Sequence, residues 1–147
     1  MAGSDPKKIV SVNKVVAATP QQIFDLLADP NRHADIDGSG SVKAAQSNAP
    51  ARLSLGAKFG MDMKIGAPYK ITNEVVEFDE GKRIAWRHFG GHVWRYILEP
   101  AEGGTLVTEQ FDWNGSKSQL MLRAINAPAR NKKSMIATLD RMAKLFA

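Results

Sequence analysis

Residues 58–65, KFGMDMKI, alternate polar and apolar side chains without a fault. A period of two is typical of a β-strand with one buried face. Here it predicts that Phe59, Met61, Met63 and Ile65 face a core. Further runs of strand-forming residues, separated by short turns rich in Gly or Pro, cover residues 69–79, 83–89, 92–99 and 105–114. Strands that follow one another through short turns pair as an antiparallel sheet.

Before these strands, the sequence predicts one more strand, over 8–17, and then a helix. Thr19 and Gln22 have the spacing of a capping box, and Pro20 suits the first helical position. We expect this helix over 21–28. The turn-rich segment that follows can hold a second short helix.

The C-terminal segment carries apolar residues at helical spacing from Met121 to Phe146, with basic residues on the opposite face. A long helix is predicted here, with Ser116 and Gln119 as its capping box. An interior proline removes a backbone hydrogen bond, so we expect a bend or break near Ala127-Pro128.

Together these elements predict an α+β domain in which a curved antiparallel sheet of about seven strands wraps around the long C-terminal helix. A sheet with one apolar face must bury it, and this helix is the one large amphipathic element left to cover it. Such a pairing leaves space between sheet and helix unless bulky side chains fill it.

Composition narrows the function classes. The chain has 147 residues, which suits one domain, predicted over 8–147 after a disordered tail or expression remnant at 1–7. The chain has no cysteine, and we expect it to bind no metal and no cofactor and to be cytoplasmic. We also expect no stable membrane insertion, because no apolar run approaches the length of a membrane span. Residues 117–147 hold seven basic side chains and one acidic, but no aromatics interleave with them for base stacking, so no nucleic-acid partner is expected.

Several motifs appear in the order found in one superfamily; they are TPQQIF at 19–24, HADIDGSG at 33–40, GKRIAWR at 81–87, WRYILEP at 94–100, and GGT at 103–105 running on to Asp112-Trp113. In these residues the chain resembles the START-like, or SRPBCC, superfamily. It is most similar to the polyketide cyclase/dehydrase and lipid transport branch, especially its small actinobacterial members. The resemblance implies a helix-grip fold (Bet v 1-like), of order β-α-α-β6-α, that encloses a hydrophobic ligand cavity.

The side chains predicted to face the interior are candidates for the wall of such a cavity. Large aromatics would define a ligand's shape, and flexible methionines would adapt to it. The candidate ligand-binding residues are Phe59, Met61, Met63, Ile71, Trp86, His88, Trp94, Tyr96, Glu109, Phe111, Trp113, Met121, Ile125, Met135 and Leu139. Plain core packing explains the same apolar residues, so both interpretations remain open.

His88, Tyr96 and Glu109 are the polar groups placed inside, and they are the candidate catalytic residues. A buried carboxyl must be paired, hydrogen-bonded or protonated. With an imidazole and a phenol nearby it could move a proton next to a carbonyl. Orienting the polar head of an apolar ligand is the role we favour.

His33, Asp35 and Asp37 alternate in a loop, and a metal or acid–base cluster is one interpretation. The favoured interpretation is a turn, with Asp37 accepting hydrogen bonds from nearby backbone N–H groups.

The leading hypothesis is therefore a monomer or homodimer that binds a small hydrophobic or aromatic molecule, such as a lipid, polyketide or related metabolite. The alternative is a cyclase or dehydratase acting by general acid–base catalysis in the same cavity. A third possibility is a protein-interaction module that uses the basic face of the C-terminal helix, with Arg130, Lys133 and Arg141.

Overall fold

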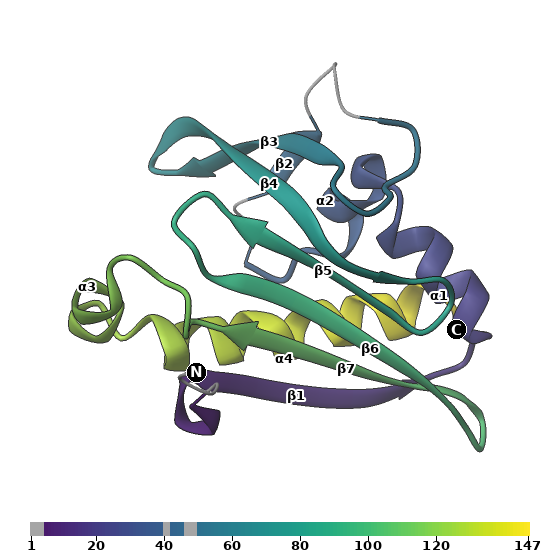
Figure 1. The fold of residues 1–147 in the computed structure, drawn as a ribbon. Coiled ribbons are helices and arrows are strands. Elements are labelled where there is room, and N and C mark those ends of the chain that lie inside the picture. The colour runs from purple at the N-terminus through teal and green to yellow at the C-terminus, as the bar shows by residue number, and fades with distance from the viewer. Residues whose placement is uncertain (1–4, 40–41, 46–49) are drawn as a thin grey trace.

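The computed structural model describes residues 5–39, 42–45 and 50–147. Within these residues seven strands form one antiparallel sheet, in the order β1-β7-β6-β5-β4-β3-β2 (Figure 1). The strands are β1 (Ile9–Val16), β2 (Val42–Ala45), β3 (Lys58–Ile65), β4 (Ala67–Asp79), β5 (Arg83–His88), β6 (Val93–Ala101) and β7 (Gly104–Asp112). The α-helices are α1 (Pro20–Leu27), α2 (His33–Ile36), α3 (Gln119–Ala124) and α4 (Ala127–Leu145).

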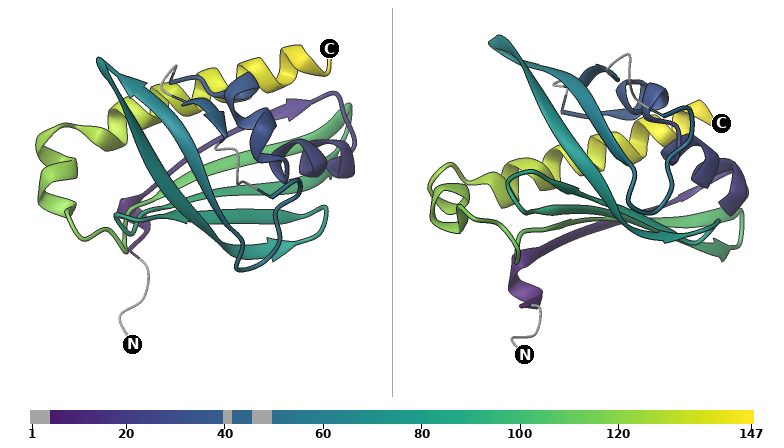
Figure 2. Two further views of the ribbon diagram at one scale, coloured as in Figure 1. Left: turned by 90° about the horizontal axis from the view of Figure 1, so that it is seen from above. Right: turned by 45° about the horizontal axis from the view of Figure 1, so that its top comes forward.

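The sheet curves, and α4 runs along its concave side while α1 and α2 lie at one end (Figure 2). This is the predicted helix-grip architecture. The strand predicted over 58–65 coincides with β3, and the other strands differ from their predicted bounds by a few residues. A register shift between Val75 and Glu77 explains why the two faces of β4 are less distinct in the sequence.

The predicted capping box starts α1. The Thr19 side chain accepts a hydrogen bond from the Gln22 backbone N–H (3.2 Å), and the Gln22 side chain accepts one from the Thr19 N–H (2.9 Å). The helix buries Ile23, Phe24 and Leu27 completely. After a 3₁₀ turn at Pro30–Arg32, the predicted second short helix is α2.

The C-terminal segment forms two helices, so the bend or break predicted near Ala127-Pro128 is a complete break. Asn126 adopts a left-handed conformation (φ 57°) and separates α3 from α4, at the predicted place of the break. Pro128 lies in the first turn of α4, where a missing N–H disrupts nothing. The capping box expected at Ser116 and Gln119 does not form; the Gln119 side chain donates instead to the Asn114 carbonyl (2.8 Å).

The N-terminal part of the chain is ordered earlier than residue 8. Asp5 N–H donates to the Asn114 side chain (2.7 Å), and a 3₁₀ helix (η1, Pro6–Lys8) follows. The ordered domain therefore includes residues that the sequence assigned to a tail, while residues 1–4 of that tail lie outside the described residues.

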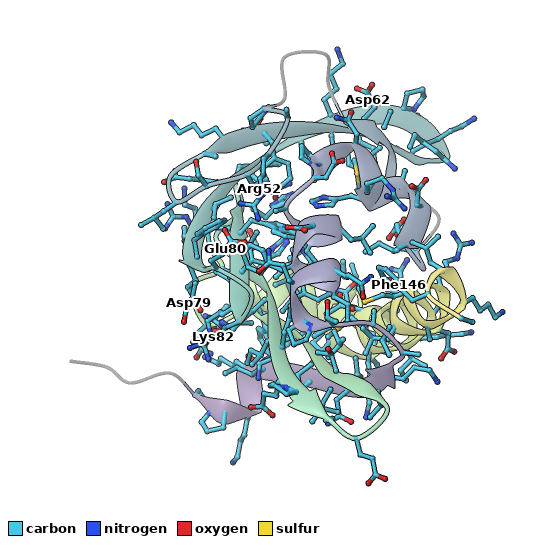
Figure 3. All side chains as sticks on the ribbon, turned by 90° about the vertical axis from the view of Figure 1, so that its right-hand side faces the viewer. Arg52, Asp62, Asp79, Glu80, Lys82 and Phe146 are labelled. Atoms are coloured by element: carbon cyan, nitrogen blue, oxygen red, sulfur yellow. The ribbon has the colours of Figure 1, made fainter. Side chains whose placement is uncertain are left out.

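The end of the molecule that contains α1 is closed by charged and aromatic side chains. Arg52 lies next to Glu80 (2.6 Å; Figure 3) and also contacts Asp25 (3.1 Å). Its guanidinium lies over the rings of Phe24 and Phe78. These ion pairs are exposed, so each adds little stability. Their role is to cover the apolar core at this end.

Among the helices that the structure describes, none has both the length and the apolar character that a membrane span requires.

The loop after α2 packs directly on α4. Gly38 N–H donates to the Thr138 hydroxyl (2.8 Å), and Thr138 in turn donates to the Ser134 carbonyl (3.0 Å). A Cβ at Gly38 would overlap backbone atoms of Ser134 and Thr138. This position therefore has no room for a side chain, and it fixes how closely α2 approaches α4.

We expect Gly38→Ala to lower the free energy of unfolding by about 1–3 kcal/mol, because α2 and α4 must separate to admit the methyl group. Gly90→Ala is the control, since its nearest neighbour is the movable His88 side chain (3.2 Å) rather than a backbone. Urea denaturation of both variants measures the difference. Equal losses would contradict the tight contact at Gly38.

Candidate ligand cavity

A cavity of about 570 Å³ lies between the concave face of the sheet and α4. Strands β3 to β7 form its floor, and α2, with the loop after it, and α4 form the other walls. Its walls are mainly apolar. The predicted ligand-binding residues that line it are Met61, Met63, Ile71, Trp86, His88, Trp94, Tyr96, Glu109, Ile125 and Met135.

The structure places five other residues on that predicted list away from this cavity. Phe59 is buried against Trp86, with their ring centroids 5.7 Å apart. Phe111, Trp113 and Leu139 are core residues, which fill space elsewhere under the sheet. Met121 is 63% exposed on α3, because the break at Asn126 takes α3 out of phase with the apolar stripe of α4.

Several lining residues escaped the sequence analysis, and most of them are polar. Asn73 lies on β4 between Ile71 and Val75, and every second side chain of this part of the strand points inward. The strand period could therefore have identified Asn73. Thr138 shares the helical face of Met135. His33, Asp37 and Arg130 drew notice in the sequence for other possible roles, and they too line the cavity. The remaining polar residues had no signal in the sequence, because each depends on how the layers approach one another; they are Ser39, Lys64, Tyr69, His92, Asn131 and Ser134.

Glu109 faces inward, as predicted, and it is 4% exposed. Its cross-strand neighbour on β6 is Tyr96, which is also buried. Burial raises the pKa of Glu109 to about 8; the nearby Tyr96 hydroxyl lowers it, and the charge of Asp37 raises it further. Burial, followed by the neighbouring Glu109, raises the pKa of Tyr96 well above its usual value. At neutral pH both groups are therefore mostly protonated.

Among the residues that the structure describes, two buried oxygen atoms at the cavity have no hydrogen-bond partner, Glu109 Oε1 and Asn73 Oδ1. A buried polar atom without a partner costs free energy, so such atoms often mark a place where another molecule completes the bonding. The cavity is thus apolar in most of its walls and unsatisfied at a few polar points.

His88 and His92 stack at the β5–β6 turn with their ring centroids 4.3 Å apart. Burial lowers the pKa of both imidazoles, that of His92 to about 4, where the charge of His88 adds to the effect. His88 Nδ1 accepts a hydrogen bond from Gly90 N–H (3.0 Å), which leaves Nε2 to carry the proton of the neutral ring. Two neutral imidazoles therefore border the cavity at neutral pH.

The residues His33, Asp35 and Asp37 do not converge on a common point. His33 is buried, stacks on Trp86 (4.8 Å) and has its Nε2 2.8 Å from the Leu27 carbonyl. Asp35 pairs with Arg32 (2.7 Å). Asp37 accepts from the backbone N–H groups of Ser39 and Val42, which is the predicted turn. In the part of the chain that the structure describes, no group of three or more potential metal ligands is present.

The raised pKa of Glu109 has a consequence for stability. Its pKa rises from 4.5 to about 8 on folding, so the folded chain holds a proton in this window and stability falls as pH rises through it. Glu109→Gln removes this titration. We expect the variant to gain stability over the wild type between about pH 5 and about pH 9, by at most about 5 kcal/mol. Urea denaturation across this range tests it, and parallel pH curves would contradict a buried, titrating Glu109.

Known proteins resemble this chain in sequence and in fold. The family model described as polyketide cyclase / dehydrase and lipid transport matches residues 7–147. The uncharacterised protein Rv0088 of Mycobacterium tuberculosis is 35% identical over 144 residues, which are 94% of this chain and 64% of that protein. The chain thus spans less than two thirds of the length of this relative.

Solved structures share the fold at low sequence identity. The protein NE0264 of Nitrosomonas europaea has a TM-score of 0.74 at 15% identity, covering 96% of this chain and 95% of its own. The AHSA1-like protein of Aeromonas hydrophila has a TM-score of 0.69 at 18% identity, covering 92% and 90%. With the family model spanning nearly the whole sequence, this chain belongs to the polyketide cyclase/dehydrase and lipid transport family of the SRPBCC superfamily.

Proposed function

We propose that this protein binds a small hydrophobic or aromatic molecule, of the lipid or polyketide kind, in the cavity between the sheet and α4. The observation that carries the proposal is the cavity itself, about 570 Å³ in volume and lined by Trp, Met and Ile side chains. Pockets for small molecules have volumes of roughly 300–1,000 Å³ and combine apolar walls with a few polar points. Membership of the family supports the same function.

The polar points suggest how the ligand is oriented. Protonated Glu109 can donate a hydrogen bond, and the unpaired Asn73 Oδ1 can accept one. A ligand with a carbonyl or hydroxyl group at one end would satisfy both residues, while its apolar body would lie against Trp86, Trp94 and Ile71. An ionised group fits less well beside Glu109 and Asn73, because it would have to leave water for a buried site, whereas the charged lining residues Lys64 and Arg130 lie at the exposed edge of the cavity.

Filling the cavity should abolish binding. Ile71 lines it, whereas the next residue, Thr72, points to the opposite, exposed face of β4. We expect Ile71→Trp to reduce the affinity for the neutral apolar probe N-phenyl-1-naphthylamine by at least about tenfold, and Thr72→Trp to leave it unchanged. Probe fluorescence measures affinity, and circular dichroism checks that both variants fold. Equal affinities for the two variants would show that the probe binds outside the cavity.

The acid–base groups favour a second candidate, an enzyme of the cyclase or dehydratase type. A carboxyl with a pKa of about 8 is protonated and deprotonated near neutral pH, which suits a group that takes a proton from carbon and returns it. Tyr96 and the neutral His88 border the same space and can hydrogen-bond a carbonyl oxygen. Binding and catalysis in one cavity are compatible, so only kinetics separates the two functions.

The two candidates make different predictions for conservative substitutions. If the protein is an enzyme, Glu109→Gln should reduce turnover of an aromatic polyketide substrate by about 10²–10⁴-fold and leave its binding nearly unchanged. If it is a carrier, no turnover is detected in either protein. Tyr96→Phe and His88→Gln extend the comparison. Native mass spectrometry of the freshly purified protein identifies any co-purified molecule to use in the assay.

A further inference from the structure

The end of the molecule opposite α1 exposes an unusual number of large apolar side chains. Leu120 is 81% exposed, Met121 63% and Ile125 49% on and just after α3, and Phe89 in the β5–β6 turn is 65% exposed. No residue of α3 is buried. Leu122 is partly buried against the Phe111, Trp113 and Met135 core, but the neighbouring leucine and methionine stay exposed, so α3 has little of the packing that normally stabilises short helices in water.

These apolar residues lie close together. Lys117 N–H donates to the Gly90 carbonyl (3.0 Å), which joins the segment before α3 to the turn that carries Phe89. Phe89 and Lys117 also line the same surface depression. Figures 1 and 2 agree that α3 projects beyond the sheet on the side of the β5–β6 turn. We call Phe89, Leu120, Met121 and Ile125 the apolar tip.

Positively charged side chains flank the α3 part of the apolar tip, while beside Phe89 the acidic Glu74 is paired with Arg87 (3.7 Å). The segment 115–133 contains Lys117, Arg123, Arg130, Lys132 and Lys133 and no acidic residue. All five of these side chains are exposed. Arg123 lies over the Trp113 ring (5.3 Å), so its charge stays beside α3. Exposed apolar side chains with flanking cations are the composition of surfaces that bind anionic lipid bilayers.

The cavity opens beside the same surface. Ile125 and Arg130 line it on the α4 side, and the exposed residues Lys64 and Tyr69 line it on the β3–β4 hairpin. Ile125 therefore belongs both to the apolar tip and to the cavity wall. A molecule that enters or leaves between α4 and this hairpin passes next to the apolar tip.

We propose that the apolar tip and its flanking cations dock this protein peripherally on an anionic lipid bilayer, with the mouth of the cavity facing the membrane. The charge favours lipid headgroups, and the scattered apolar side chains fit a soft interface that can receive each one separately. In this position an apolar ligand could move between bilayer and cavity without crossing water. The transfer of a ligand between bilayer and cavity rests on the proposed function, whereas the docking itself does not.

Sedimentation with vesicles tests the docking. We expect the wild type to bind phosphatidylcholine vesicles containing about 30% phosphatidylglycerol, to bind pure phosphatidylcholine at least about tenfold more weakly, and to dissociate in high salt. Leu120→Ser with Met121→Ser should weaken binding at least about tenfold. The matched control is Leu55→Ser with Leu145→Ser, two exposed apolar residues distant from α3.

A second pair of variants tests the charge. Lys117→Glu with Lys133→Glu should weaken binding to the anionic vesicles at least about tenfold, while Lys82→Glu with Lys144→Glu, which changes the net charge equally, should weaken it much less. None of these residues lines the main cavity. Failure of the wild type to bind protein-free anionic vesicles overturns the proposal, and a protein partner on this surface would give that result. Equal effects of test and control pairs overturn it as well.

The outcomes for the surface and for the cavity are separable. Vesicle binding that persists in Ile71→Trp, together with loss of probe binding in that variant, supports both proposals. Vesicle binding without any probe binding by the wild type retains the docking surface and removes the proposed function. Probe binding without vesicle binding retains the proposed function and removes the docking surface.

Discussion

A single helix cannot cover a seven-stranded sheet, and this mismatch shapes the whole molecule. Strands about 4.8 Å apart make such a sheet roughly 30 Å wide, whereas a helix with its side chains is about 10 Å across. Curvature reduces the difference but does not remove it. The chain covers one end of the concave face with α1 and α2, where Phe24, Leu27 and Ile84 pack without exposure. At the other end the space between β3–β7 and α4 stays open as the cavity.

The partial cover explains the chemistry of the cavity. Glu109 and Tyr96 are neighbours on β7 and β6, and the sheet holds both beneath α4, where water solvates them poorly. Burial is therefore the main cause of the raised pKa of each, and it leaves Glu109 Oε1 without a partner. In a fully packed core an apolar residue at position 109 would be more stable, because an unpaired buried carboxyl is destabilising. Retaining it makes sense if a ligand completes its hydrogen bonding.

Much of the fold follows from local patterns. The alternation at 58–65 predicts β3, the Thr19–Gln22 spacing predicts the start of α1, and Pro128 predicts the break before α4. The inward positions of Trp86, Tyr96 and Glu109 follow from the strand period as well. The capping box predicted at Ser116 and Gln119 was wrong, because the Gln119 side chain donates to the Asn114 carbonyl instead. The fifteen-residue list combined cavity wall with packed core, and the strand period alone does not separate these two roles.

The sequence by itself determined which face of most strands is buried, which helix must cover the sheet, and that Tyr96 and Glu109 point inward. These features depend on periods of two and 3.6 along the chain. Tertiary structure alone decided which inward residues border empty space and which are packed. It also brought His33, Asn73 and Thr138 to one cavity, and the turn that carries Phe89 beside the segment of Lys117 that leads into α3, from parts of the chain distant in sequence. The physical reason is that volume and proximity depend on how closely the layers approach, and contacts such as Gly38 on α4 set that approach.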